Sequence, residues 1–280
     1  MEEVSPKEKP LKRILIHSLI VIPFAIAVSC ALLFAAVRLL TREKQTAYDF
    51  LEDVKVGGAT KRWQSAFELS KMLANPDLVP QEEGFTQEMV SAFRKSKQDD
   101  SRVRQYLALA MGRTGKAVFF EPLTEDIAHE KEENLSAVIY AIGMLKDPRG
   151  VAILNQFLDH REGRIRSIAV VAIGNIAYPP SLGKLRKALY DSEPNVQWGA
   201  AISLAKMGDS TGKPILLKML DREYLSKFPE VDWQEQNYLL LSAIEAASLL
   251  HESELNAQLE RLSKTDSNMK IKAAALEKLK

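Results

Sequence analysis

From Val103 onward, apolar residues recur along the chain with a period of 31. Aligned at this spacing, the chain shows four columns in which every position is apolar: Leu107, Val138, Ala169 and Ala200; Met111, Ile142, Ile173 and Leu204; Leu123, Leu154, Leu185 and Leu216; and Ile127, Leu158, Leu189 and Leu220. With 46% apolar residues in the chain, chance gives such a set roughly a few times in a million. The pattern therefore indicates an architecture built from copies of one unit.

Within each unit the apolar spacing is helical. Val196, Ala200 and Leu204 follow one another at steps of four, which places them on one helical face. The unit then breaks at residues 208–212, and a second helix is predicted near Pro214, since proline fits a first helical turn. Each unit is thus predicted to be a helical hairpin whose apolar side is buried only by stacking on its neighbours. A fifth column holds small residues, where helices of adjacent units can approach closely: Gly112, Gly143, Gly174 and Ala205.

The period also predicts how the chain is divided. The step from Ala201 to Ala243 is 42 rather than 31, which places an insertion of about eleven residues within 221–237. Residues 38–102 are predicted to form a linker and a degenerate opening repeat. The solenoid is predicted over 103–280, with units near 103–133, 134–164, 165–195, 196–237 and 238–270 and a terminal helix over 271–280.

Residues 14–37 form an apolar segment without Asp, Glu, Lys or Arg. As a helix it would be about 36 Å long, enough to cross a hydrocarbon layer of ~30 Å, so we predict a single transmembrane helix that contacts the lipid bilayer. A cleaved secretory signal has a shorter apolar core. A lipoprotein signal stays open as an alternative, because residues 27–30 (Ala-Val-Ser-Cys) loosely resemble its processing site.

The flanks of this segment predict its orientation. Four Lys and Arg residues precede it within the N-terminal tail, residues 1–13, and three follow it. This small excess favours a cytoplasmic N-terminus and a periplasmic C-terminal domain. We therefore predict a single-pass protein of a bacterial-type inner membrane.

Composition narrows the function classes. The 38 basic and 37 acidic residues leave a net charge of +1, which argues against a nucleic-acid partner, because neutralising phosphates takes a clear basic excess. One cysteine cannot form an internal disulfide. The low total of 13 Gly and 12 Pro in 280 residues favours helix.

Two segments carry a family resemblance. Residues 196–220, VQWGAAISLAKMGDSTGKPILLKML, resemble the short HEAT-like repeat of the phycobilisome-lyase type, and VRQYLALAMGRTG at 103–115 is a second copy. The second unit departs from the pattern at Asn134 and Lys146, where valine and glycine are typical. The resemblance implies an all-α fold, a right-handed α-solenoid of HEAT-like hairpins. It also implies a family composed mostly of scaffolds, with a few enzymes among them.

Candidate chemistry is sparse. His129-Glu130 and His251-Glu252 resemble the His-Glu pairs of a di-iron hydroxylase family, but their phases in the repeat differ, so stacking would not bring them together. His129 and His160 share a phase but would lie about 10 Å apart in adjacent units, long for a common ion. No nucleophile elbow or phosphate-binding glycine loop occurs. We therefore predict no catalytic residue, no metal ligand and no cofactor.

Two groups of residues are candidates for binding a partner. We expect the second helices to line the concave face, where their charges would pass from acidic to basic along the solenoid and fix the register of a bound chain. The insertion adds aromatic residues that either anchor a partner or pack back on the neighbouring repeat. The candidate partner-binding residues are Glu121, Glu125, Lys184, Arg186, Lys187, Lys218, Tyr224, Phe228 and Trp233.

Together, these observations predict a membrane-anchored, non-catalytic scaffold. Its α-solenoid surface would bind one or more proteins of a membrane or envelope complex. The alternative is an accessory subunit of a lyase- or hydroxylase-type HEAT-repeat enzyme that binds a pigment or a metal.

Overall fold

A computed structural model describes residues 17–40 and 45–279, in two units that divide after Thr46. Every regular element in these ranges is a helix, and none is a β-strand. The all-α prediction is therefore confirmed. The predicted N-terminal tail, residues 1–13, and the first three residues of the predicted span, 14–16, lie outside the described residues.

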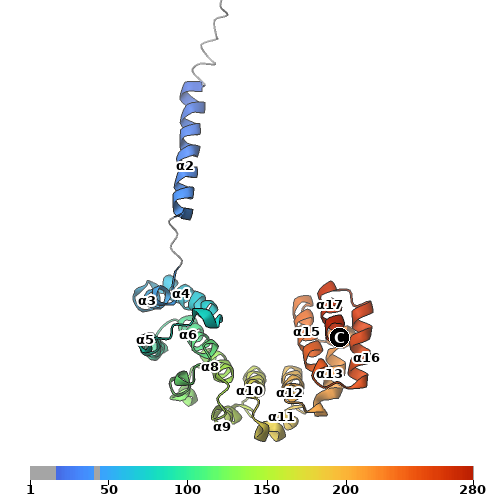
Figure 1. The fold of residues 1–280 in the computed structure, drawn as a ribbon. Coiled ribbons are helices and arrows are strands. Elements are labelled where there is room, and N and C mark those ends of the chain that lie inside the picture. The colour runs from blue at the N-terminus through green and yellow to red at the C-terminus, as the bar shows by residue number, and fades with distance from the viewer. Residues whose placement is uncertain (1–16, 41–44, 280) are drawn as a thin grey trace, which may run out of the picture. The chain divides into compact units, whose positions relative to one another are not determined.

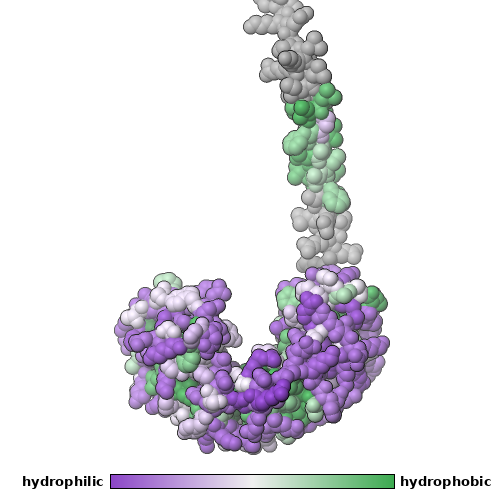
Figure 2. All heavy atoms as spheres, turned by 180° about the vertical axis from the view of Figure 1, so that it is seen from behind, coloured by the Kyte–Doolittle hydropathy of each residue, from purple (hydrophilic) through white to green (hydrophobic). Residues whose placement is uncertain are grey.

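The first unit contains a π-helical turn, His17–Val21, followed by α2, Ile22–Leu40. Its large apolar side chains are exposed, among them Phe24 and Phe34 at 69% each. Figure 2 shows this apolar surface in green, in contrast to the mostly hydrophilic surface of the second unit.

The prediction of a membrane anchor is not supported. Within the described residues, no helix combines the length and the apolar character that crossing a membrane requires. The sequence argument treated 14–37 as one α-helix, whereas the α-helix begins at Ile22 and covers only the later part of that segment. The predicted single-pass location in an inner membrane is therefore contradicted.

The second unit, from Ala47, is a stack of helices (Figure 1). Five long helices form most of its middle and late part, and each buries small or apolar residues along one face. They are α6 Ser101–Arg113, α8 Glu132–Leu145, α10 Gly163–Ile176, α12 Pro194–Lys206 and α15 Trp233–Ser248. Shorter helices alternate with them: α7 Phe120–Thr124, α9 Gly150–Leu154, α11 Leu182–Ala188, α13 Lys213–Met219 and α14 Arg222–Leu225. The unit opens with α3 Ala47–Val56, α4 Ala59–Met72 and α5 Glu83–Lys95, and it closes with α16 Ser253–Thr265 and α17 Met269–Glu277.

The stack of this unit is curved. The long helices α8, α10 and α12 lie on its inner side and pack against one another in sequence, while the short helices α9 and α11 lie on its outer side (Figure 1). We had expected the second helices of the hairpins to line the concave face. The structure instead places the first helices there.

The predicted apolar columns form the core. All sixteen positions are buried except Leu158, which is partly buried against the same cluster. The prediction that stacking buries the apolar side of each hairpin is confirmed, because one cluster of buried side chains runs from Ala47 to Ala275.

The column of small residues sets the distance between consecutive long helices. A Cβ atom added to Gly143 on α8 would lie 2.5 Å from the Cα atom of Ala172 on α10. A Cβ atom on Gly112 would lie 2.7 Å from the Cα atom of Ala141. Real Cβ atoms do not approach backbone atoms this closely, so the helices can pack at this distance only with glycine in the column.

The long helices also end in a repeating way. The backbone at their C-terminal ends turns through the left-handed region at Gly115, Lys146, Ala177 and Gly208, which are spaced by 31 residues. A left-handed residue terminates a helix by satisfying its last carbonyl groups. Lys146 keeps this conformation, with φ of 55°, although it lacks the freedom of glycine, so this departure from the repeat pattern does not change the turn.

Candidate functional site: an inner-face groove

A groove with a volume of about 600 Å³ lies on the inner side of the second unit. Residues of α10, α12 and α15 line it. Its apolar lining includes Ile168 and Val171 from α10, Trp198 and Ile202 from α12, and Leu239 from α15. The groove lies next to the insertion, where α15 packs on α12 over a smaller surface than α12 shares with α10.

The same 31-residue period that builds the core also builds this groove. One column of positions on the long helices reads Leu109, Tyr140, Val171 and Ile202, and these residues are all incompletely buried although apolar. They lie two residues, or about 200° of helical rotation, from the core columns on either side, and Val171 and Ile202 line the groove. Sequence reasoning missed them because it sought binding residues on the second helices; the signal was an apolar column in excess of what the core needs.

Charged residues surround the groove. Arg164 on α10, Lys206 on α12, and Glu235 and Glu245 on α15 all border it and are exposed. In the described part of the chain, no carboxylate or cationic group forms an ion pair with Lys206, Glu235 or Glu245. Unpaired charges around an apolar floor are typical of a binding surface, where a partner supplies the opposite charges.

The charged candidates from the sequence lie on the short helices, and most of them are paired within the chain. Arg149 donates to Glu121 at 2.9 Å, and Arg94 donates to Glu125 at 2.8 Å. Arg186 donates to Asp209 at 2.8 Å, measured from its Nε atom. Lys187 lies 4.0 Å from Asp159. These pairs join neighbouring repeats. The remaining two candidates, Lys184 and Lys218, are exposed on α11 and α13.

Two of the three aromatic candidates pack on α12, the long helix of the repeat that carries the insertion. The rings of Phe228 and Trp198 meet edge to face, with their centroids 5.1 Å apart. Tyr224 contacts both rings and its hydroxyl accepts a hydrogen bond from Trp198 Nε1 at 3.3 Å. Trp198 is 2% exposed, so the aromatic residues of the insertion complete the burial of the groove's largest side chain.

The third aromatic candidate, Trp233, stays 51% exposed. The guanidinium group of Arg222 stacks on its ring at 4.1 Å. The same guanidinium donates from Nε to Asp266 at 2.7 Å and from Nη2 to Asn237 at 2.7 Å. Arg222 thus fastens the insertion to α15 and to the loop before α17.

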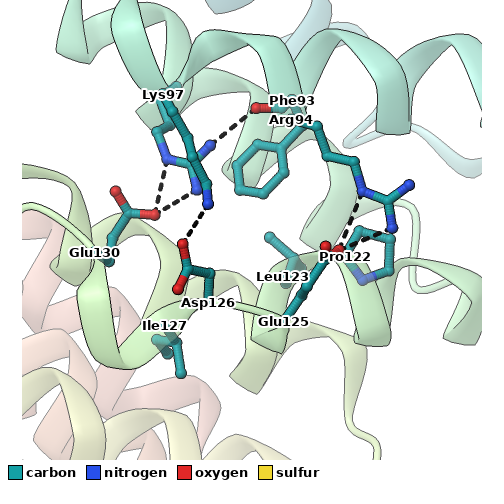
Figure 3. A pocket seen from close by; sticks show the side chains of 10 residues that line it. Phe93, Arg94, Lys97, Pro122, Leu123, Glu125, Asp126, Ile127 and Glu130 are labelled. Atoms are coloured by element: carbon teal, nitrogen blue, oxygen red, sulfur yellow. Dashed lines mark hydrogen bonds and ion pairs between the residues drawn. The ribbon is translucent and has the colours of Figure 1, made fainter.

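A second hollow, of about 180 Å³, lies between α5, α6 and α7 (Figure 3). It is polar, and its charges neutralise one another. Arg104 pairs with Glu130 with only 4% and 5% of the two side chains exposed, and its guanidinium donates to the carbonyl oxygen of Phe93 at 2.9 Å. Asn134, a departure from the repeat pattern, donates to the same Glu130 at 3.2 Å. This hollow is therefore a structural ion-pair site, in which each charge already has its partner.

A related pair recurs two repeats later. Arg166 lies 62 positions after Arg104 and binds Asp191 through two nitrogen atoms, each at 2.8 Å. The hydrogen bonds from Arg166 hold the pKa of Asp191 below its usual value, against the opposing effect of burial. Both arginines tie a long helix to the end of its own hairpin.

The two His-Glu pairs identified in the sequence lie in separate surroundings, where Glu130 binds Arg104 and Glu252 lies 3.3 Å from the Nζ atom of Lys213. His129 is exposed and its Nδ1 atom lies 2.9 Å from Asp126 Oδ1. Within the described residues, no three His, Cys, Asp or Glu side chains lie close enough together to hold a metal ion.

Comparisons with known proteins agree with this architecture. Residues 152–226 match the family model described as HEAT repeats. No curated protein matches the sequence. The fold is similar to that of the complex of CpcE and CpcF of phycocyanin lyase from Nostoc sp. PCC7120, with a TM-score of 0.58 and 16% identity over 85% of this chain and 95% of that chain.

Two further solved structures are similar at lower scores. Human deoxyhypusine hydroxylase matches with a TM-score of 0.40 and 15% identity over 83% of this chain and 95% of that chain. A designed armadillo repeat protein matches with a TM-score of 0.36 and 18% identity over 84% of this chain and the whole of that chain. The match to the HEAT-repeat model and the similarity to the CpcE–CpcF complex confirm the repeat-helical fold and the HEAT repeats expected from the sequence.

One expectation about function needs correction. The sequence led us to predict a chain that is not an enzyme, partly because its solenoid resembles scaffolds. The similarity to phycocyanin lyase contradicts that prediction, because the same fold occurs in proteins named for an enzymatic activity. The solenoid is therefore no evidence against a role in catalysis.

Proposed function

We propose that this chain is an accessory subunit of a lyase-type HEAT-repeat enzyme and that it binds another protein subunit in its inner-face groove. The observation that carries the proposal is the groove itself, an apolar floor bordered by charges that have no partner within the described chain. The similar solved structure is a complex of two subunits, CpcE and CpcF, which supports a subunit role. A right-handed course of the solenoid stays a prediction from the sequence.

The alternative surface is the outer one. The paired residues Glu121, Glu125 and Arg186 gain less from a partner, because a new ion pair would have to replace one already made. Lys184 and Lys218 are exposed and could bind a partner as the sequence analysis proposed. The two surfaces can be separated by experiment, since they lie on different helices.

Affinity purification of the full chain from its own cells, followed by chromatography of the complex, tests the proposal. An inner-face variant, Ile202→Asp with Lys206→Glu, should lose the co-purified subunit and keep its helical circular dichroism. An outer-face variant, Lys184→Glu with Lys218→Glu, is the matched control and should retain it. Loss with the outer variant alone would move the binding site to the outer face, and an unchanged monomer in all three samples would refute the proposal.

A pigment is a second candidate ligand, because the groove volume falls in the range of small-molecule sites of about 300–1,000 Å³. An absorption band in the visible range of the purified chain, absent from the inner-face variant, would favour it. A colourless complex that retains the protein subunit would exclude it.

A further inference from the structure

The apolar surface of the groove continues across the long helices α6, α8, α10 and α12. It consists of two rows of positions spaced by 31 residues, and every side chain in them is apolar or a tyrosine and is incompletely buried. The rows are Tyr106, Ala137 and Ile168, and Leu109, Tyr140, Val171 and Ile202. The first row stops at α10, because Gly199 at its next position is buried. Ile168, Val171 and Ile202 line the groove, and the other members take the same positions in earlier repeats, so the two rows form one apolar strip.

The four long helices under this strip run parallel in one register. The close contacts across the column of small residues join Gly112 to Ala141, Gly143 to Ala172 and Gly174 to Ser203. The two members of each pair are 29 residues apart, which requires that consecutive long helices point in the same direction. Packed helices lie about 8–10 Å apart, so the second row presents one apolar side chain at about this interval on each of the four helices.

A polyproline II helix matches this interval. It has three residues per turn and rises about 3.1 Å per residue, so side chains three positions apart lie on one face at about 9 Å from each other. Four such side chains span about 28 Å, and the axes of the four long helices span about 24–30 Å. A β-strand returns to one face about every 6.7 Å and an α-helix about every 5.4 Å, so neither matches the interval. Tyr106 and Tyr140 add the aromatic surface on which polyproline II segments dock.

The C-terminal edge of the strip is rich in cations. Most of each long helix and its C-terminal turn contains no Asp or Glu, over residues 105–115, 134–146, 164–178 and 195–208. Because the helices are parallel, their C-terminal ends lie along one edge, which holds Arg113, Lys146 and Lys206. Within the described residues, Lys146 and Lys206 form no ion pair, and Arg113 donates to the carbonyl oxygen of Ser70 at 2.7 Å. Glu245 of α15 borders the groove together with Lys206, so the excess of cations lies toward α6 and α8.

We propose that the strip binds a polyproline II segment of the partner subunit, with an apolar residue at every third position and acidic residues on one edge. The segment crosses α6, α8, α10 and α12 and places one apolar side chain on each. Its acidic edge faces the C-terminal ends of these helices, which fixes its direction, because a reversed segment would turn the acids away from the cations. The inference rests on the proposed function and adds the conformation and the charge of the segment that the partner contributes.

Three fluorescent peptides of twelve residues test this inference on the full chain. The first repeats Leu-Pro-Glu four times, and the second repeats Leu-Pro-Lys four times. The third has the composition of the first, but its leucines are placed at irregular intervals of one to five positions. Fluorescence anisotropy should show the first peptide binding at least about fivefold more tightly than the second, because of the cations, and at least about tenfold more tightly than the third, whose leucines no longer share one face.

Variants of the chain supply the sharper test. Tyr140→Asp places a carboxylate in the strip and should weaken binding of the first peptide about tenfold. The matched control is Tyr190→Asp, at a side chain that is 85% exposed just after α11, and it should bind as the parent does. Lys146→Glu with Lys206→Glu should remove the preference for the acidic peptide. All variants should keep the helical circular dichroism of the parent.

Three results would overturn the inference: no binding of the first peptide, equal binding of the irregular peptide, or equal losses in the two tyrosine variants. The proposed function is tested separately, because Tyr140 lies outside the groove. If any of these results is found while Ile202→Asp with Lys206→Glu still loses the native subunit, the groove binds its partner without a polyproline II segment.

Discussion

The substitution Gly143→Ala tests whether the glycine column sets the distance between the long helices. The added Cβ atom would lie 2.5 Å from the Cα atom and 3.0 Å from the carbonyl oxygen of Ala172. These are backbone atoms, so no side chain can rotate away and α8 must move relative to α10. Overpacking of this kind costs about 1–3 kcal/mol, while the better helix propensity of alanine returns up to about 1 kcal/mol.

We therefore expect the free energy of unfolding to fall by about 1–2 kcal/mol. In a unit of 150–250 residues this lowers the melting temperature by about 2–8 °C. Thermal unfolding followed by circular dichroism measures it. The matched control is Gly183→Ala on the exposed side of α11, where a Cβ atom meets nothing within 4 Å, and this variant should be as stable as the parent or slightly more stable.

A second glycine distinguishes backbone from side-chain contact. At Gly174 the added Cβ atom would meet the Oγ and Cβ atoms of Ser203 at 2.1 and 2.3 Å. Combining Gly174→Ala with Ser203→Gly removes both atoms, so the double variant should be more stable than the sum of the two single losses predicts.

The outcome that would refute the reasoning concerns the first pair of variants. If Gly143→Ala and Gly183→Ala unfold at the same temperature, the glycine column does not set the distance between the long helices.

Three further predictions follow from the contacts. Arg104→Met leaves the Glu130 carboxylate buried and unpaired, so urea titration should show a loss of about 3–5 kcal/mol, whereas Arg94→Met removes a surface pair and should cost under about 1 kcal/mol. Phe228→Ala should cost about 3–5 kcal/mol as an aromatic truncation, but the half-exposed Trp233→Ala under about 1 kcal/mol, and similar losses for both would contradict the packing described. The pKa of Asp191 is lowered in the folded state, so the ionised carboxylate stabilises the fold above the unfolded pKa of about 3.9, and this stabilisation is lost as the pH falls through the folded pKa. The variant Asp191→Asn should therefore be less stable than the parent at pH 7. It should also lose less stability than the parent does between pH 5 and pH 3.

The interior of the hairpins could be predicted closely from the sequence. The residues Leu107, Val138, Ala169 and Ala200 are all fully buried, as their 31-residue spacing indicated. Local geometry explains this success. Within a helix, residues at steps of three and four share one face, and this holds regardless of how the helix packs in the tertiary structure. The glycine at position 143 could be assigned to a close contact for the same reason.

The binding candidates depended on the curvature of the stack, which the sequence pattern does not contain. The expectation that short second helices face inward directed attention to Glu121 on α7 and Lys184 on α11, whereas α11 lies on the outer side of the stack (Figure 1). The groove residues Val171 and Ile202 formed an equally regular column. From the sequence alone, Val171 and Ile202 could equally have been core residues. Their position in the groove on the inner face shows that they are not.

The sequence by itself determined that helical hairpins repeat every 31 residues and which of their residues are buried, because both follow from the period of a helix and the need to remove apolar surface from water. The tertiary structure alone decided which face of each hairpin turns inward and which charges are neutralised. It also decided that the groove lies beside the insertion. These features depend on contacts between helices far apart in the chain, and a residue such as Glu125 is paired or free according to what a neighbouring repeat places beside it.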